Sequence, residues 1–391
     1  MQSSFIPYGR QTITQADIAA VLEGLQSPFL TQGPAVPTFE RAIAAKVGAS
    51  HGIAVNSATS ALHIACLALG LGRGDRLWTS PITFVASANC GLYCGATVDF
   101  VDIDPSTGLM SLDALQVKLE RAESNGTLPK ILVPVHLSGS SCDVVRIASL
   151  SERYGFLVLE DASHAIGGRY RAEPVGNCQY SSITVFSFHP VKIITTGEGG
   201  LATTNDPRLA QRMMDLRSHG ITKDFNRFEN PPAGPWSYEQ QSLGFNYRMT
   251  DIQAVLGLSQ LQRLDAIVDE RNDQSMRYID LLSELPVRLL KVPNNVLSSW
   301  HLFVICLCNS LKNHHRFIFE GLRSANIGVQ LHYSPVHLQP YYRKLGFEEG
   351  DFPEAELYGR SAISLPIFPG LSIEDQQRVV MVLADLLEST R

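Results

Sequence analysis

A single lysine set between two apolar segments is the feature that most constrains this chain. Residues 182–188 form an apolar, strand-like run, and residues 201–203 form another. Lys192 lies between them and is followed by a turn of threonines and glycines at 195–200. Burying a lysine costs free energy unless its amine is paired or used chemically, and a buried amine of lowered pKa can condense with an aldehyde. The alternative is a surface lysine at a hairpin tip, which is the commoner situation for lysine.

A second apolar segment, about thirty residues upstream, ends in two acids. Residues 156–159 are all apolar and run directly into Glu160 and Asp161. A continuous apolar run of this kind is typical of a buried parallel strand whose carboxyl end carries function. An aspartate there can keep a pyridine nitrogen protonated, which makes a pyridoxal ring an electron sink. The alternative for Asp161 is the N-cap of a helix that follows the strand.

Two further strand ends carry residues suited to binding a cofactor. A short strand over residues 52–56 runs into a turn of small and hydroxyl residues, 57–60, and then into a helix that reaches about Leu69. Free backbone N–H groups at such a helix start form an anion site suited to phosphate, although a plain Ser/Thr N-cap would have the same sequence. Phe84 follows the strand at 76–80, where it could stack on a cofactor or belong to the core.

Short apolar runs alternate with helical patterns through residue 205, which predicts an α/β fold with a mostly parallel sheet and helices on both faces. The chain has 391 residues, too many for one compact core. We therefore expect a large domain over residues 1–250 and, over 251–391, a linking helix and a small C-terminal domain.

Local patterns predict several elements of this arrangement. Thr14 should cap a helix over 14–25, and Thr250 or Asp251 should cap one long helix reaching about residue 282, with Gln260 turned away from its apolar face. Other predictions are a proline-rich mobile loop at 221–242, strands near 299–307 and 327–332, and a helix at 374–389.

Composition excludes several classes of function. The net charge of −6 and the lack of a basic block argue against a nucleic-acid partner. Residues 77–98 carry no charge, but Pro81, Asn89 and two glycines favour buried strand, loop and helix over a membrane span, and residues 1–10 lack the pattern of a signal peptide. The seven cysteines have no zinc spacing, so we expect reduced thiols, no metal site and a cytoplasmic protein.

Six motifs in one order resemble the DegT/DnrJ/EryC1/StrS family of sugar aminotransferases, and the resemblance covers essentially the whole chain. The motifs are Asn56–Leu62, Glu160–Ala165, Ser187–Lys192, Gly197–Gly200, Arg217–Gly220 and Gly244–Arg248. Within the family, the segments Asn56–Leu62, 186–200 and Gln330–Pro335 are most similar to the transaminases of pseudaminic acid biosynthesis. One departure is Ser334, where that branch has lysine.

The resemblance implies the aspartate-aminotransferase-like fold of pyridoxal-phosphate enzymes, fold type I, and a role for each matching residue. Lys192 would hold pyridoxal phosphate covalently, Asp161 would pair with the ring nitrogen, and His164 would lie near the ring hydroxyl. Phe84 would stack on the ring. The phosphate would be bound by Ala58, Thr59 and Ser187 of the same chain, joined by Asn246 of the partner subunit. The nucleotide-sugar site would be lined, in part from the partner, by Tyr8, Pro28, Phe29, Leu30, Thr31, Gln330, Leu331, His332 and Tyr333.

The implied reaction moves the amino group of L-glutamate to C4 of a UDP-linked 4-keto-6-deoxy-N-acetyl-hexosamine, in a homodimer with shared sites. Three rivals remain. They are the same chemistry on another nucleotide 4-keto sugar, a sugar deoxygenation that uses histidine where this chain has Lys192, and a non-catalytic sugar sensor. The sequence singles out no arginine for the glutamate carboxylate.

Overall fold

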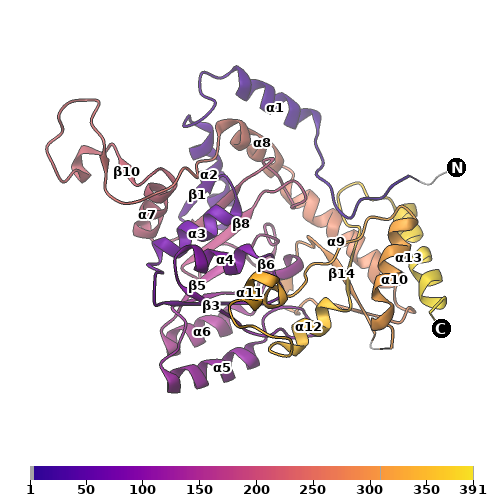
Figure 1. The fold of residues 1–391 in the computed structure, drawn as a ribbon. Coiled ribbons are helices and arrows are strands. Elements are labelled where there is room, and N and C mark those ends of the chain that lie inside the picture. The colour runs from indigo at the N-terminus through magenta and orange to yellow at the C-terminus, as the bar shows by residue number, and fades with distance from the viewer. Residues whose placement is uncertain (1–3, 309, 391) are drawn as a thin grey trace.

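The computed structural model describes residues 4–308 and 310–390. Its main element is a seven-stranded sheet (Figure 1). The strands, in spatial order, are β1 (His51–Val55), β9 (Gly200–Thr204), β8 (Ile183–Ser187), β5 (Leu157–Asp161), β4 (Ile131–Val133), β2 (Arg76–Thr79) and β3 (Thr97–Phe100). Strand β9 runs antiparallel to both of its neighbours, and the pairs from β8 to β3 are all parallel. The predicted α/β fold with a mostly parallel, mixed sheet is confirmed.

Side chains along each strand point alternately to the two faces of the sheet, which divides the large core into two clusters. In β1, Ile53 and Val55 join a cluster with helices α3 (Ala58–Ala68) and α4 (Ala86–Tyr93). Between them, Ala54 joins a cluster with α2 (Ala35–Val47) and α8 (Asp251–Leu261). Successive strand residues point to opposite faces, so both faces of the sheet are covered. The other helices of this part are α1 (Gln15–Gln26), α5 (Leu112–Asn125), α6 (Val144–Tyr154) and α7 (Pro207–Arg217).

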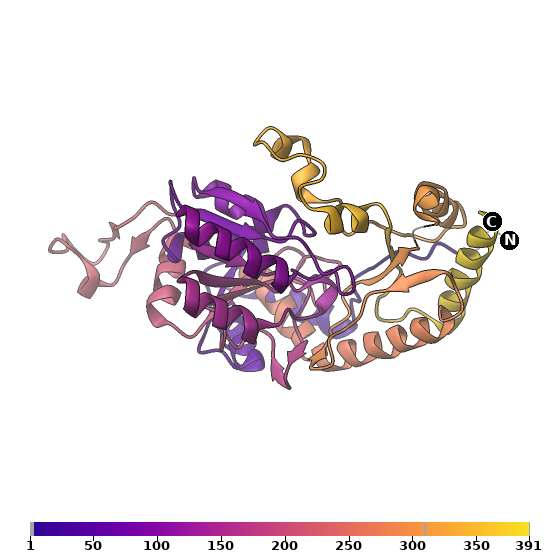
Figure 2. The same ribbon diagram turned by 90° about the horizontal axis from the view of Figure 1, so that it is seen from below.

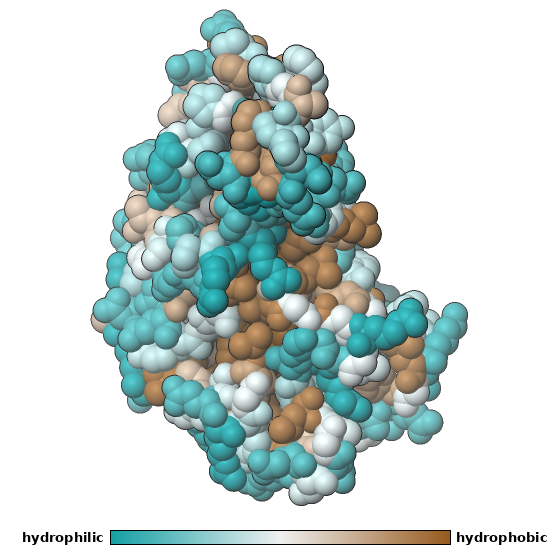
Figure 3. All heavy atoms as spheres, turned by 90° about the vertical axis from the view of Figure 1, so that its left-hand side faces the viewer, coloured by the Kyte–Doolittle hydropathy of each residue, from teal (hydrophilic) through white to brown (hydrophobic). Residues whose placement is uncertain are grey.

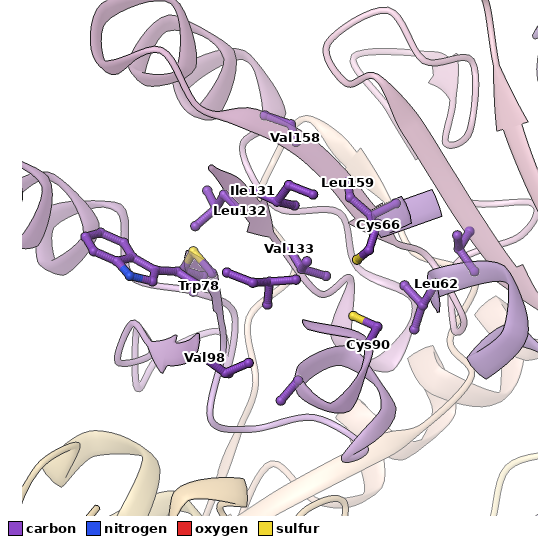
Figure 4. Packing of buried hydrophobic residues seen from close by; sticks show 14 of the residues in the cluster. Leu62, Cys66, Trp78, Cys90, Val98, Ile131, Leu132, Val133, Val158 and Leu159 are labelled. Atoms are coloured by element: carbon purple, nitrogen blue, oxygen red, sulfur yellow. The ribbon is translucent and has the colours of Figure 1, made fainter. Parts of the chain in front are cut away.

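Small side chains let the helices lie close to the sheet in the first cluster. Figure 4 shows Leu62 and Cys66 of α3 and Cys90 of α4 packed near Val133 and Leu159. All seven cysteines are free thiols, as expected. The five of them that are buried act as small apolar groups in the core.

The C-terminal part has its own antiparallel sheet, ordered β12 (Val287–Leu289), β14 (Phe303–Leu307), β15 (Ala362–Leu365). Helices α10 (His315–Ser324) and α13 (Ile373–Glu388) pack in the same cluster. The short strands and α-helices are β6 (Arg169–Tyr170), β7 (Glu173–Pro174), β10 (Ile221–Thr222), β11 (Glu239–Gln240), β13 (Val296–Leu297), α11 (Pro340–Arg343) and α12 (Pro353–Gly359). Among the described residues, no helix is long and apolar enough to cross a membrane.

The expected single linking helix is wrong, because two helices stand in its place. Helix α8 ends at Leu261 and α9 (Leu264–Leu281) begins after a break. Leu264 at the start of α9 packs in a cluster of the large sheet, while Tyr278 near its end packs in the small-domain core. Figure 2 shows α9 spanning the distance between the two bodies. The boundary at residue 250 stays a prediction.

Three smaller expectations also need correction. Gln260 is only 2% exposed, because its amide donates to the buried Asp17 carboxylate. The strand expected at 327–332 is absent from the described chain, where single bridges at Ile327 and Gln330 replace it. The segment 221–242 is more than an irregular loop, because β10 pairs with β11 at the base of a projecting arm (Figure 1). The caps predicted at Thr14 and Thr250 are confirmed, and each forms a capping box.

Candidate active site

A cavity of about 450 Å³ lies where several strands of the large sheet end. Its wall includes the turn after β1, Phe84 beyond β2, Asp161 at the end of β5, and Ser187 at the end of β8. Ligands of open α/β sheets bind at the carboxyl ends of strands. The small-domain side contributes further residues to the same wall, namely His301, His332 and Tyr333.

Lys192 lines this cavity and does not lie at an exposed hairpin tip. The turn after β8 brings it back toward the sheet, and its backbone N–H donates to the His189 carbonyl at 2.9 Å. Burial lowers the pKa of Lys192 to about 8, although the Asp161 carboxylate opposes this shift. A larger share of the amine is therefore uncharged near neutral pH than for an ordinary lysine.

Asp161 is 4% exposed, and each of its carboxylate oxygens accepts a hydrogen bond. The Ser87 hydroxyl donates to Oδ2 at 2.6 Å, and the Ser163 backbone N–H donates to Oδ1 at 3.1 Å. A turn rather than a helix follows the strand, so Asp161 is not a helix N-cap. Each oxygen keeps a free lone pair, which leaves room for one more donor from a ligand.

His164 is held as a neutral ring with a defined tautomer. The Ser138 backbone N–H donates to Nδ1 at 3.3 Å, so the ring proton is on Nε2, which lies 3.1 Å from the Tyr333 hydroxyl. Burial, followed by the nearby Lys192 and His332, keeps the pKa of His164 well below its usual value. This imidazole can therefore donate a hydrogen bond but does not carry a charge at neutral pH.

The start of α3 forms the anion-binding end of the cavity. Ser57 caps the helix by accepting from Ser60, and Ala58, Thr59 and Ser187 line the cavity beside it. The first turn of an α-helix has N–H groups that the helix itself does not use. Gly200 keeps this turn against β9, because a Cβ there would come within 2.4 Å of the Ala58 nitrogen.

The remaining predicted residues divide into two groups. Tyr8, Phe84, His332 and Tyr333 line the cavity with those above. The others do not line it: Pro28, Phe29, Leu30, Thr31, Asn246, Gln330 and Leu331. Phe29 and Leu30 are about half exposed on the outside of the molecule. The resemblance assigned some of these residues to a partner's site, and their roles stay predictions.

Sequence reasoning missed two close neighbours of Lys192 and Asp161. Ser87 bonds to Asp161 from α4, and His301 approaches Lys192 from the segment before β14, with Nε2 3.5 Å from Nζ. Both contacts join residues more than seventy positions apart, so no local pattern in the sequence predicts them. Within the described chain, no group of three or more histidine, cysteine, aspartate or glutamate side chains is arranged to bind a metal.

Comparison with known proteins connects this geometry to one family. The sequence model of the DegT/DnrJ/EryC1/StrS aminotransferase family matches residues 11–384. The spore coat polysaccharide biosynthesis protein SpsC of Bacillus subtilis is 39% identical, over 99% of this chain and 98% of its own length.

Solved structures agree with the sequence match. Helicobacter pylori PseC, described as an aminotransferase involved in the biosynthesis of pseudoaminic acid, is 32% identical with a TM-score of 0.90, covering 99% of this chain and all of its own. The putative sugar aminotransferase Spr1654 of Streptococcus pneumoniae, in its PLP form, is 28% identical with a TM-score of 0.89, over 99% of this chain and all of its own.

Proposed function

We propose, starting from the fact that the chain belongs to the DegT/DnrJ/EryC1/StrS aminotransferase family, that it transfers the amino group of L-glutamate to C4 of a UDP-linked 4-keto-6-deoxy-N-acetyl-hexosamine. The product would be UDP-4-amino-4,6-dideoxy-N-acetyl-β-L-altrosamine, for pseudaminic acid biosynthesis. The protein is a sugar aminotransferase with the fold type I architecture of its structural relatives, and it uses pyridoxal phosphate. The choice of sugar, nucleotide and carbon atom is the proposal.

The residues of the cavity fit pyridoxal phosphate in kind and in number. They supply an amine of lowered pKa at Lys192, a buried carboxylate at Asp161, and a helix start with adjacent hydroxyls for the phosphate. Bound there, the cofactor supplies an electron sink that lets a carbon bearing the amino group lose its proton. The single observation that carries the proposal is the presence of Lys192 and Asp161 in the wall of one cavity.

The protein's own part of the reaction is to hold groups and to move protons. The Lys192 Nζ, with a pKa of about 8, can accept a proton from the substrate carbon and return it near neutral pH. Asp161 stays in place for the ring nitrogen because Ser87 and Ser163 fix both of its oxygens. Histidine in the place of Lys192 would mark the deoxygenating branch, so this residue favours amino transfer.

A homodimer with shared sites is part of the proposal. No arginine lines the cavity among the described residues, although glutamate and a UDP-sugar both carry negative charge. Meanwhile Asn246 and the segment after α1, which the resemblance assigns to the site, lie outside the cavity of their own chain. A second copy that supplied such residues would complete the wall, as in an interface with twofold symmetry.

The surface supports this arrangement. Helix α1 exposes Ile18, Leu22 and Leu25. Trp236 of the arm and Leu243 just after it are more than three-quarters exposed. Figure 3 views the molecule from the side on which the arm projects and shows apolar residues gathered near the middle of that face. Contiguous apolar surface of this kind is typical of an interface.

A different nucleotide 4-keto sugar is the second candidate, and two observations favour it. The relative named for spore coat polysaccharide biosynthesis is 39% identical, compared with 32% for PseC. Ser334, which departs from lysine in the pseudaminic branch, lies next to the predicted sugar-binding residues. The substrate bound there would contact serine at position 334 instead of lysine, which could suit a different nucleotide or sugar.

The test is amine production with a panel of substrates. The purified protein is incubated with L-glutamate and, separately, with UDP-linked 4-keto-6-deoxy-N-acetyl-hexosamines of both C5 configurations and with the corresponding dTDP-linked 4-keto-6-deoxy sugar. We expect mass spectrometry to find the 4-amino sugar with the UDP substrate of β-L-arabino configuration. Faster amination of another member of the panel would replace the proposed substrate, and no amination of any member would overturn the proposed choice of sugar, nucleotide and carbon atom.

A further inference from the structure

The imidazole of His301 is the part of the cavity wall that the roles above leave unexplained. Its Nε2 lies 3.5 Å from Lys192 Nζ, and its ring centroid lies 4.4 Å from that of His164. The residue is 4% exposed and lines the cavity. It reaches the lysine from the segment between β13 and β14, on the small-domain side.

The backbone around His301 is fixed from both sides, so the point from which the ring extends does not depend on the lysine. The Ser299 hydroxyl donates to the His164 carbonyl at 2.8 Å, and the Ser299 N–H donates to Gly139 at 3.1 Å. From α9, the buried Arg271 donates to the carbonyls of Trp300 and His301. Trp300 also adopts a left-handed φ of 47°, which a tryptophan accepts only where surrounding contacts impose it.

Burial, together with the titratable groups that face it, keeps the ring of His301 neutral. Burial comes first among the causes that hold its pKa well below the usual value, followed by Lys192, His164, Arg271 and His332. Its Nδ1 has no hydrogen-bond partner among the described residues. A neutral ring with its proton on Nδ1 presents the lone pair of Nε2 to the lysine, so it accepts a hydrogen bond from the amine instead of repelling it.

We propose that His301 is a positioning residue for Lys192, whose free ε-amine it holds through a hydrogen bond to Nε2 between the two proton transfers of each half-reaction. The amine takes one proton from the substrate carbon and returns one, and His301 itself gains and loses none. A flexible four-carbon side chain is thereby kept at one place in a cavity with room for other orientations. The inference rests on the proposed aminotransferase function, but not on which sugar is used.

Two amide variants separate the hydrogen bond from the bulk of the ring. In His301→Gln the side-chain oxygen can reach the place of Nε2, whereas in His301→Asn it reaches only the place of Nδ1. The first measurement is the single-turnover reaction with L-glutamate alone, followed by the loss of visible absorbance, with ordinary and α-deuterated glutamate. We expect His301→Asn to be about 100-fold slower, because a misplaced catalytic group costs a factor of this order. Its isotope effect should rise, and His301→Gln should recover most of the rate.

The second measurement does not depend on turnover. After treatment with glutamate the Lys192 amine is free, and its acetylation by acetic anhydride is followed against pH by peptide mass spectrometry. A hydrogen-bond acceptor stabilises the protonated amine, so its loss in His301→Asn should lower the labelling midpoint by about one pH unit. The midpoint should stay in place in His301→Gln and in the control variant His51→Asn, at the start of β1.

An unchanged labelling midpoint together with an unchanged isotope effect in a folded His301→Asn variant would overturn the proposal. The same conclusion follows if both variants lose rate equally, because then bulk rather than the hydrogen bond matters. Failure of the sugar assignment would leave both measurements intact, since neither contains a sugar. The two proposals can therefore fail separately.

Discussion

At the scale of single residues, the wall around the Lys192 amine controls its reactivity. Burial lowers the pKa of this amine to about 8, and Asp161 in the same cavity limits the shift. An amine of this kind is a base that can also be reprotonated within the physiological range, which proton transfer in both directions requires. The same pKa leads to a testable prediction about how the rate of cofactor binding depends on pH.

The protein freed of cofactor should take up pyridoxal phosphate at a rate that follows the uncharged fraction of Lys192. The rate, read from the growth of the visible absorption band, should rise with pH to a midpoint near 8 and then level off. Lys192→Ala should show no such band and no turnover, yet it should still bind pyridoxamine phosphate, because Asp161 and the α3 turn remain. A midpoint near the ordinary lysine value would contradict the assigned environment.

Ser87 should matter for cofactor binding although no motif contains it. Its hydroxyl donates to Asp161 Oδ2 at 2.6 Å and also lies 2.6 Å from the Thr83 hydroxyl. Ser87→Ala removes a hydrogen bond to a charged group in a buried place, so we expect the dissociation constant of pyridoxamine phosphate to rise about tenfold or more in equilibrium dialysis. Ser124→Ala, on the surface of α5, serves as the control. Equal affinity of the Ser87 variant and the wild type would refute this role.

At the scale of elements, sequence patterns predicted what local interactions determine. The caps at Thr14 and Thr250 are set by residues three positions away, so they could be read directly. The break before α9 could not, because it lies within a continuous helical pattern. Gln260 is buried where its amide donates to Asp17 of α1 and to the Thr12 carbonyl, both far away in sequence. Contacts of this range leave no periodic signal in the chain.

Asp17 is the centre of the junction between α1 and α8, and its removal should weaken the fold. It is fully buried and accepts from Ser259, Gln260 and Arg263 at 2.6–2.9 Å. Asp17→Asn places a partial donor against these three donors and against the Thr14 N–H and hydroxyl. We therefore expect the free energy of unfolding in urea to fall by about 2–4 kcal/mol at pH 7. Asp265→Asn, which breaks an exposed pair with Lys46, should cost less than about 1 kcal/mol.

The same junction predicts a pH dependence. Burial opposes the charge on Asp17, but hydrogen bonds from Ser259 and Thr14 and the Arg263 charge lower its pKa below the ordinary 3.8. Its stabilising effect is therefore complete above pH 3.8 and is lost as the pH falls through the folded-state value. The difference in unfolding free energy between wild type and Asp17→Asn should shrink toward pH 3. A difference that stays constant over this range would show that ionisation is not its cause.

At the scale of the whole molecule, the sequence predicted the large α/β sheet and the residues at its strand ends, because both follow from apolar patterns along single segments. It did not predict what the small domain adds to the cavity. His301 reaches the site across the domain junction, where Arg271 on α9 donates to its carbonyl and to that of Trp300. The nearby Ser299 donates to the His164 carbonyl. Nor does one chain supply every predicted site residue, since Asn246 lies outside its own cavity. We therefore propose that the complete site forms only in an assembly of two chains, which complementation can test.

Two inactive variants should restore activity when their subunits are mixed. In a homodimer with shared sites, Lys192→Ala and Asn246→Asp damage residues that come to one site from different chains. A mixed dimer then has one doubly altered site and one intact site. After equal amounts are mixed and allowed to exchange subunits, about half of the dimers are mixed, so the amination rate should approach about a quarter of the wild-type value. Mixing Lys192→Ala with Asp161→Ala, two residues of the same cavity, should restore nothing. If the first mixture also stayed inactive although labelled subunits had exchanged, Asn246 would have to act within its own chain.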